Sequence, residues 1–113
     1  MNWKPVYALV KKIPRGRVMT YGQLAKALRL PGGARTAGRA MAASPSGAGV
    51  PWHRVVGAGG RLLIREPHAS LQRKLLETEG LTLAEKRILN FSEYQWTPGR
   101  ERAGKSARAK RKR

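Results

Sequence analysis

The sequence predicts an α+β domain in which two short helices around a tight turn precede a strand pair, a winged helix-turn-helix arrangement. Three observations support this: apolar residues recur at helical spacing, glycine and proline interrupt the segments between them, and two apolar runs enclose a glycine-rich turn. A chain of 113 residues suits one domain. We assign residues 1–97 to this domain and residues 98–113 to a basic tail, expected to be disordered.

The first two helices are predicted from their spacing and their ends. The apolar face of the first is formed by residues three or four positions apart, namely Trp3, Val6, Tyr7, Val10 and Ile13. This helix should end at Pro14. Thr20 and Gln23 fit the capping box that opens a second helix. Its inner face consists of Leu24, Ala25 and Leu28.

The rest of the domain follows from its turns. Residues 30–33 hold one proline and two glycines, and an alanine-rich helix is predicted after them over residues 34–43, completing the helix-turn-helix. Residues 55–64 predict a β-hairpin, the wing, around four residues rich in glycine. Leucines at 71, 75 and 76 predict a last helix that stops at Gly80. Thr82 to Glu85 fits another capping box.

The charge points to a polyanionic partner. The formal net charge is +18, and no acidic residue precedes Glu66. Such a charge on a folded half repels itself, so we expect nucleic acid to compensate it. A ribosome-associated or membrane-surface role is the alternative, but glycine and proline interrupt the basic residues, which disfavours an amphipathic membrane helix. No apolar run approaches the roughly 18 residues of a membrane span.

Composition also excludes several kinds of chemistry. The chain has no cysteine, which excludes disulfides, thiol catalysis and cysteine-ligated zinc. His53 and His68 do not have the spacing of a metal pair, so no metal and no cofactor are expected. The first residues lack the apolar stretch of a signal peptide. We therefore expect a cytoplasmic monomer that associates with the nucleoid when bound to DNA.

Three segments in register resemble the O6-alkylguanine-DNA alkyltransferases: residues 17–25, 34–41 and 51–56. The third reads Pro-Trp-His-Arg-Val, whereas the transferases carry Pro-Cys-His-Arg-Val, whose cysteine accepts the alkyl group. Trp52 stands at the position of that cysteine, and an indole nitrogen cannot act as the thiolate nucleophile. The chain therefore resembles the alkyltransferase-like proteins, which bind the damaged base without repairing it.

The resemblance implies roles for individual residues. Tyr21 and Arg35 map onto the pair that rotates the damaged nucleotide out of the duplex, and Arg35 would fill the vacated stack. Residues at the start of the third helix would contact DNA: Ala34, Arg35, Thr36, Ala37 and Arg39. The pocket for the base would be lined by Tyr21, Met41, Trp52, Val55 and Arg65.

Other positions separate this chain from the enzymes. Arg65 stands where the transferases commonly have a tyrosine and the alkyltransferase-like proteins an arginine. His53 and Glu79 map onto the pair that deprotonates the cysteine. Without a thiol we expect them to be structural, with imidazole and carboxylate bonded to each other under the pocket. For residues after Thr82 the resemblance suggests a short extended segment, which leaves two alternatives open there.

The expected function is a non-enzymatic sensor that binds O6-alkylguanine in duplex DNA by nucleotide flipping and marks it for nucleotide excision repair proteins. A winged-helix transcription regulator is one alternative, but an alanine-rich recognition helix offers few polar side chains for reading base edges. A transferase with another nucleophile is a second alternative. His53 is its one candidate, and histidine is a weak nucleophile toward an unactivated alkyl carbon.

Overall fold

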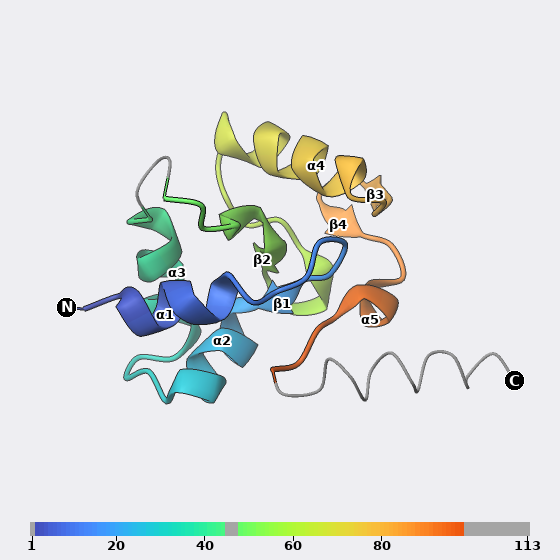
Figure 1. Cartoon of the computed structure of the whole chain (residues 1–113). Helices are drawn as coiled ribbons and strands as arrows, with labels where there is room; N and C mark the ends of the chain where they lie inside the picture. The colour runs from blue at the N-terminus through green and yellow to red at the C-terminus, as the bar shows by residue number, and fades with distance from the viewer. Residues whose placement is uncertain (1, 45–47, 99–113) are drawn as a thin grey trace, which may run out of the picture.

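A computed structural model describes residues 2–44 and 48–98, drawn in colour in Figure 1. The helices are α1 (Lys4–Val10), α2 (Tyr21–Leu28), α3 (Ala34–Ala42), α4 (His68–Thr78) and α5 (Phe91–Tyr94). The strands are β1 (Met19–Thr20), β2 (Val55–Val56), β3 (Leu83–Ala84) and β4 (Arg87–Ile88). The described residues also form two 3₁₀ turns, η1 (Trp52–Arg54) and η2 (Ala58–Gly60). The predicted α+β class is confirmed.

The helix-turn-helix forms where the sequence predicts it. Thr20 Oγ1 accepts from the Gln23 amide, and Gln23 Oε1 accepts from the Thr20 amide, both at 3.0 Å, so the predicted capping box opens α2. The helix α3 follows the glycine turn and packs against α2. The first helix is shorter than predicted: α1 ends at Val10, and the chain then forms a turn before Pro14. Helical backbone angles are disfavoured at Ile13, the residue before Pro14, so the helix cannot continue through that proline.

The strands β1 and β2 divide the interior into two cores. They pair in parallel, with Met19 opposite Val55. Neighbouring residues of a strand point to opposite sides, so Met19 and Val55 face α1, α2 and α3, whereas Val18 and Val56 face the C-terminal half. The first core also contains Val6, Val10, Ile13, Leu24, Ala25, Ala37, Ala40, Met41, Val50 and Trp96. The second contains Leu62, Leu76, Leu81, Leu83 and Ile88.

The predicted hairpin over residues 55–64 is wrong. The strand β2 pairs with β1, and the Val55 carbonyl on its other side accepts from Gln72 Nε2 at 3.1 Å. The Gly57 amide donates to the Arg61 carbonyl at 2.7 Å, but beyond this turn the Leu62 amide donates to the Lys86 carbonyl, also at 2.7 Å. The short hairpin of this fold is formed instead by β3 and β4. Residues 82–85 accordingly follow the extended alternative, not the helical one.

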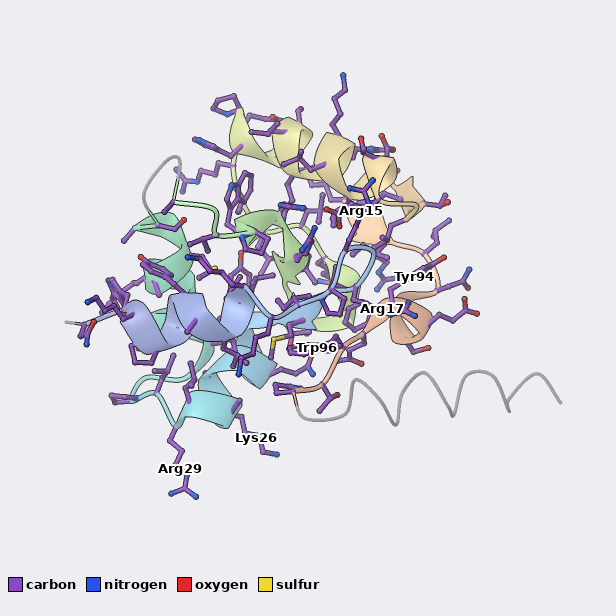
Figure 2. All side chains as sticks on the ribbon, viewed as in Figure 1. Arg15, Arg17, Lys26, Arg29, Tyr94 and Trp96 are labelled. Carbon is purple, nitrogen blue, oxygen red and sulfur yellow. The ribbon has the colours of Figure 1, made fainter. Side chains whose placement is uncertain are left out.

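The last long helix and the segment after it close the fold. The helix α4 runs to Thr78 and is followed, as predicted, by Gly80 in a left-handed conformation. Its buried face is Ala69, Gln72 and Leu76, whereas Leu71 is exposed. Further on, Trp96 returns to the first core, its amide donating to the Val18 carbonyl at 2.7 Å. Trp96 is labelled in Figure 2.

Two further predictions concern the ends and the environment of the chain. Within residues 2–44 and 48–98 we find no helix with the length and apolar character needed to cross a membrane. The basic tail predicted for residues 98–113 lies, from residue 99 on, outside the described residues.

Candidate nucleic-acid interface

A cavity of about 520 Å³ opens between α2, α3, the η1 turn and the start of α4. Tyr21 comes from α2 and Met41 from α3, Trp52 comes from η1, and His68 and Leu71 come from α4. The wall is mostly apolar, and a volume of this order is typical of sites for small ligands. The cavity is therefore large enough to receive a single nucleobase.

Three of the five predicted pocket residues, Tyr21, Met41 and Trp52, line this cavity. Val55 does not line it, because its side chain is fully buried in the first core. Arg65 lies exposed on the loop before α4 and also stands outside the lining, whereas its neighbour Ile64 belongs to it. Ile64 and the first residues of α4 thus belong to the lining, whereas Arg65 does not.

Trp52 stands between two imidazole rings. Its ring lies edge-on to His53, with centroids 6.1 Å apart, and edge-on to His68, with centroids 6.2 Å apart. Such edge-to-face geometry is favourable for aromatic rings. His68 is a cavity residue that the sequence analysis missed, because neither its spacing nor its neighbours indicate that the start of α4 faces Trp52. It supplies a hydrogen-bonding ring to a mostly apolar wall.

Tyr21 brings a hydroxyl to the same cavity. It is the first residue of α2, held in place by the capping box before it. Burial raises the pKa of the Tyr21 phenol above its usual 10.0. The hydroxyl therefore stays protonated at neutral pH and can donate a hydrogen bond to a bound base.

Behind Trp52, the carboxylate of Glu79 collects donors from three directions. His53 Nε2 lies 2.8 Å from Glu79 Oε2, and Arg54 Nη2 lies 2.8 Å from the same oxygen. The Gly16 amide donates to Oε1 at 3.1 Å, and Arg54 Nη1 donates to the Ile13 carbonyl at 2.9 Å. The contact predicted between His53 and Glu79 is present, and Arg54 extends it into a cluster.

The carboxyl group at the centre of the cluster is ionised and paired with the Arg54 guanidinium. Burial alone would raise the pKa of the Glu79 carboxyl, but the hydrogen bonds from Arg54, His53 and the Gly16 amide outweigh burial and lower that pKa to about 2. Glu79 is thus ionised and fully engaged near neutral pH. The cluster ties the η1 turn to the end of α4 and to the loop after α1.

The residues of α3 predicted to contact DNA differ in exposure. Ala34, Arg35 and Arg39 are exposed, whereas the side chains of Thr36 and Ala37 are buried. The contact of these residues with DNA stays a prediction. Thr36 Oγ1 donates to the Pro31 carbonyl. A helix that packs one face against a core buries residues three or four positions apart and their neighbours on that face, because its period is 3.6 residues.

The charge of this face is uncompensated within residues 2–44 and 48–98. The ion pairs found there join Glu79 to His53 and Arg54, and Glu77 to Arg73. Arg35 and Arg39 belong to none of them. The described residues also contain no cluster of acidic and histidine side chains that could hold a metal ion.

Comparison with known proteins places this geometry among DNA-binding domains. Residues 2–81 match the family model for the DNA-binding domain of 6-O-methylguanine DNA methyltransferase. The chain is 34% identical over 93 residues to a DNA base-flipping protein of Vibrio parahaemolyticus, covering 82% of this chain and 93% of that protein. It is 38% identical over 99 residues to alkyltransferase-like protein 1 of Schizosaccharomyces pombe, covering 82% and 92%.

Solved structures give the same result. A crystal structure of the S. pombe protein with damaged DNA containing O6-carboxymethylguanine matches with a TM-score of 0.71 at 33% identity, covering 87% of this chain and all of that one. A second structure of the S. pombe protein with DNA matches with a TM-score of 0.75 at 35% identity, covering 85% and 94%. The predicted resemblance of this fold to the DNA-binding domain of the alkyltransferases is therefore confirmed.

Proposed function

This chain belongs to the alkyltransferase family, as an alkyltransferase-like member, and on that premise we propose that it is a non-enzymatic sensor of O6-alkylguanine in duplex DNA. One observation carries the proposal. Trp52 lines the cavity, and its ring packs edge-on against His53, a member of the hydrogen-bonded cluster of His53, Arg54 and Glu79. The site thus keeps the surroundings of a reactive residue and has an aromatic ring in place of the nucleophile.

The recognition step follows from the residues at the mouth and wall of the cavity. Arg35, exposed on the first turn of α3, enters the base stack as the damaged nucleotide rotates outward, and its guanidinium bonds the orphaned partner base. Tyr21, at the start of α2, turns the phosphate of the damaged nucleotide outward. Its hydroxyl donates a hydrogen bond to the bound base. The phosphates flanking the lesion lie near the positive N-terminus of α3.

The alkyl group is recognised by the aromatic and apolar wall. Trp52 presents its ring to the group on O6, and Met41 and Leu71 complete the apolar surroundings. Burying one methylene or methyl group stabilises binding by about 0.8 kcal/mol. Arg65, on the loop before α4, moves toward the bound base and places a cation beside its altered edge.

A bound lesion that is not repaired must pass to other proteins. We assign nucleotide excision repair proteins as the recipients and a monomer in the cytoplasm as the acting form. A sequence-reading transcription regulator is not proposed, because the exposed side chains of α3 include little besides Ala34, Arg35 and Arg39 for base-edge contacts.

Two measurements test the proposal. Titration of matched duplexes containing guanine or O6-methylguanine should give tighter binding to the methylated duplex, and equal affinity would refute lesion sensing. Intact-mass spectrometry after incubation with the methylated duplex should leave the protein mass and the lesion unchanged. A cysteine-dependent methyltransferase serves as the positive control, since it gains one methyl group, about 14 Da. The same gain in this chain would make it an enzyme.

A further inference from the structure

Two helices of this fold end in the same hydrogen-bonded cap, but with different residues at its critical position. After α4, the Gly80 amide donates to the Glu77 carbonyl at 3.0 Å and the Leu81 amide to the Leu76 carbonyl at 3.1 Å. After α2, the Arg29 amide donates to the Lys26 carbonyl at 3.3 Å and the Leu30 amide to the Ala25 carbonyl at 2.9 Å. Both are Schellman caps, in which one residue adopts a left-handed conformation.

Glycine is the usual residue there, because a Cβ atom is disfavoured in the left-handed region. Gly80 meets this preference with φ 101°, whereas Arg29 occupies the equivalent position with φ 53° and ψ 47°. Two glycines with positive φ follow in the same turn, Gly32 and Gly33. The chain therefore uses glycine at its other left-handed positions in this turn but a large cation at the helix cap.

The side chain of Arg29 makes no polar contact that stabilises the described part of the fold. Its side chain is exposed and takes part in none of the ion pairs or side-chain hydrogen bonds found within residues 2–44 and 48–98. Lys26, one turn earlier on α2, is exposed and equally unpaired there. Figure 2 shows both side chains extending away from the fold at the end of α2. Residues in such backbone conformations cluster at functional sites, and both of these exposed cations are free to contact a partner.

We propose that Lys26 and Arg29 form a phosphate-binding pair for the DNA backbone, beyond the contacts of α3. The proposal rests on the DNA binding proposed above, but not on lesion recognition. The pair precedes Arg35 by a single tight turn, and no acidic residue of the chain precedes Glu66. The guanidinium of Arg29 suits two phosphate oxygens at once, and the ammonium of Lys26 adds a point charge one helical turn away. The pair anchors the backbone beside the site where Arg35 enters the stack.

The Arg29→Gly variant tests the pair because stability and affinity should change in opposite directions. Glycine relaxes the helix cap, so the melting temperature should rise by about 3 °C. Affinity for an undamaged duplex should fall by roughly threefold to tenfold, and the log-log salt slope should become shallower by about 0.9 for each phosphate that the variant no longer neutralises. A variant that gains stability and keeps its affinity and salt slope would overturn the proposal.

Matched variants separate this effect from a general loss of charge. Arg29→Lys keeps the cation and should retain most of the salt slope, and Lys26→Gln should reduce the slope about as much as Arg29→Gly does. Lys74→Gln removes an exposed cation from α4, which Figure 1 shows on the far side of the β1–β2 pair from α2, and should leave the slope unchanged. An equal reduction in Lys74→Gln would mean that charge alone, not a built contact, is measured.

The undamaged duplex keeps this test independent of the proposed function. If binding shows no preference for O6-methylguanine but Arg29→Gly still flattens the salt slope, lesion sensing fails and the phosphate pair stands. If the preference is present and Arg29→Gly leaves the slope unchanged, the phosphate pair fails and lesion sensing stands.

Discussion

The two sides of the η1 turn differ in exposure, polarity and hydrogen bonding, although their residues are adjacent in sequence. Trp52 faces an open, mostly apolar cavity and is only half-buried. His53 and Arg54 face the other way and bind the Glu79 carboxylate, whose side chain is 5% exposed. One side offers surface to a ligand, and the other is already saturated by internal hydrogen bonds.

The difference separates the residues that hold the site together from the residues that face the cavity. The Glu79 cluster holds the turn, the end of α4 and the loop after α1 in a fixed arrangement, with or without a nucleophile to activate. Trp52 projects from that fixed turn into the cavity. Substitutions on the cluster side should therefore mainly lower the free energy of unfolding. Substitutions on the cavity side should mainly change the binding of damaged DNA.

The largest effect is expected from Glu79→Ala. Removal of the carboxylate leaves Arg54, His53 and the Gly16 amide without their shared acceptor, and breaking a buried ion pair in this way costs about 3 kcal/mol of unfolding free energy or more. Urea denaturation measures the loss. The control is Glu77→Ala, which breaks an exposed pair with Arg73 and should cost under about 1 kcal/mol. Equal losses in the two variants would contradict a structural role for the cluster.

Acid should reproduce much of this loss in the unmodified protein. The pKa of Glu79 is about 2 in the folded chain against an ordinary 4.5, so the folded state holds its proton less tightly than the unfolded state does. Its contribution is therefore complete above about pH 4.5 and disappears as the pH falls toward about 2. The shift corresponds to roughly 3 kcal/mol. Subtracting the pH profile of Glu79→Gln isolates the effect, and parallel profiles would rule out this cause.

On the cavity side, Arg35→Ala should weaken binding to O6-methylguanine duplexes by about 1–3 kcal/mol, because filling the vacated stack offsets an unstacking cost of a few kcal/mol. Its unfolding free energy should hardly change, since the side chain is exposed. A fluorescent base analogue at the lesion position reports extrusion. If it brightens equally with the variant and the original protein at saturation, Arg35 is only a phosphate contact.

The smallest effect is expected on the preference for O6-methylguanine duplexes over guanine duplexes. Trp52→Ala removes the ring against the alkyl group and should reduce the preference for O6-methylguanine over guanine by about fourfold, the equivalent of one buried methyl group, about 0.8 kcal/mol. His68→Ala should reduce it less, because this ring packs on Trp52 from the cavity edge. Paired titrations on both duplexes measure the ratio. Leu89→Ala, an exposed leucine outside the lining, should leave the ratio unaltered.

Local signals in the sequence determined much of this protein. The capping box of Thr20 and Gln23, the stop at Gly80 and the alanine-rich helix after the glycine turn depend on neighbours within a few residues, so they could be predicted accurately. The absence of a thiol at Trp52 and the contact of His53 with Glu79 followed from residue identity within the family motifs.

Tertiary structure decided what depends on distant partners. Val55 and Val56 could pair locally with residues 62–64 by pattern alone, but β1 and Gln72 occupy both sides of that strand. The same dependence placed His68 in the cavity wall, withdrew Val55 from it, and turned Thr36 and Ala37 inward. The local conformational preference of a two-residue strand or of one helix face is too weak to determine which segment packs against it. The choice is made by the packing of segments far apart in the chain, which no short stretch of sequence contains.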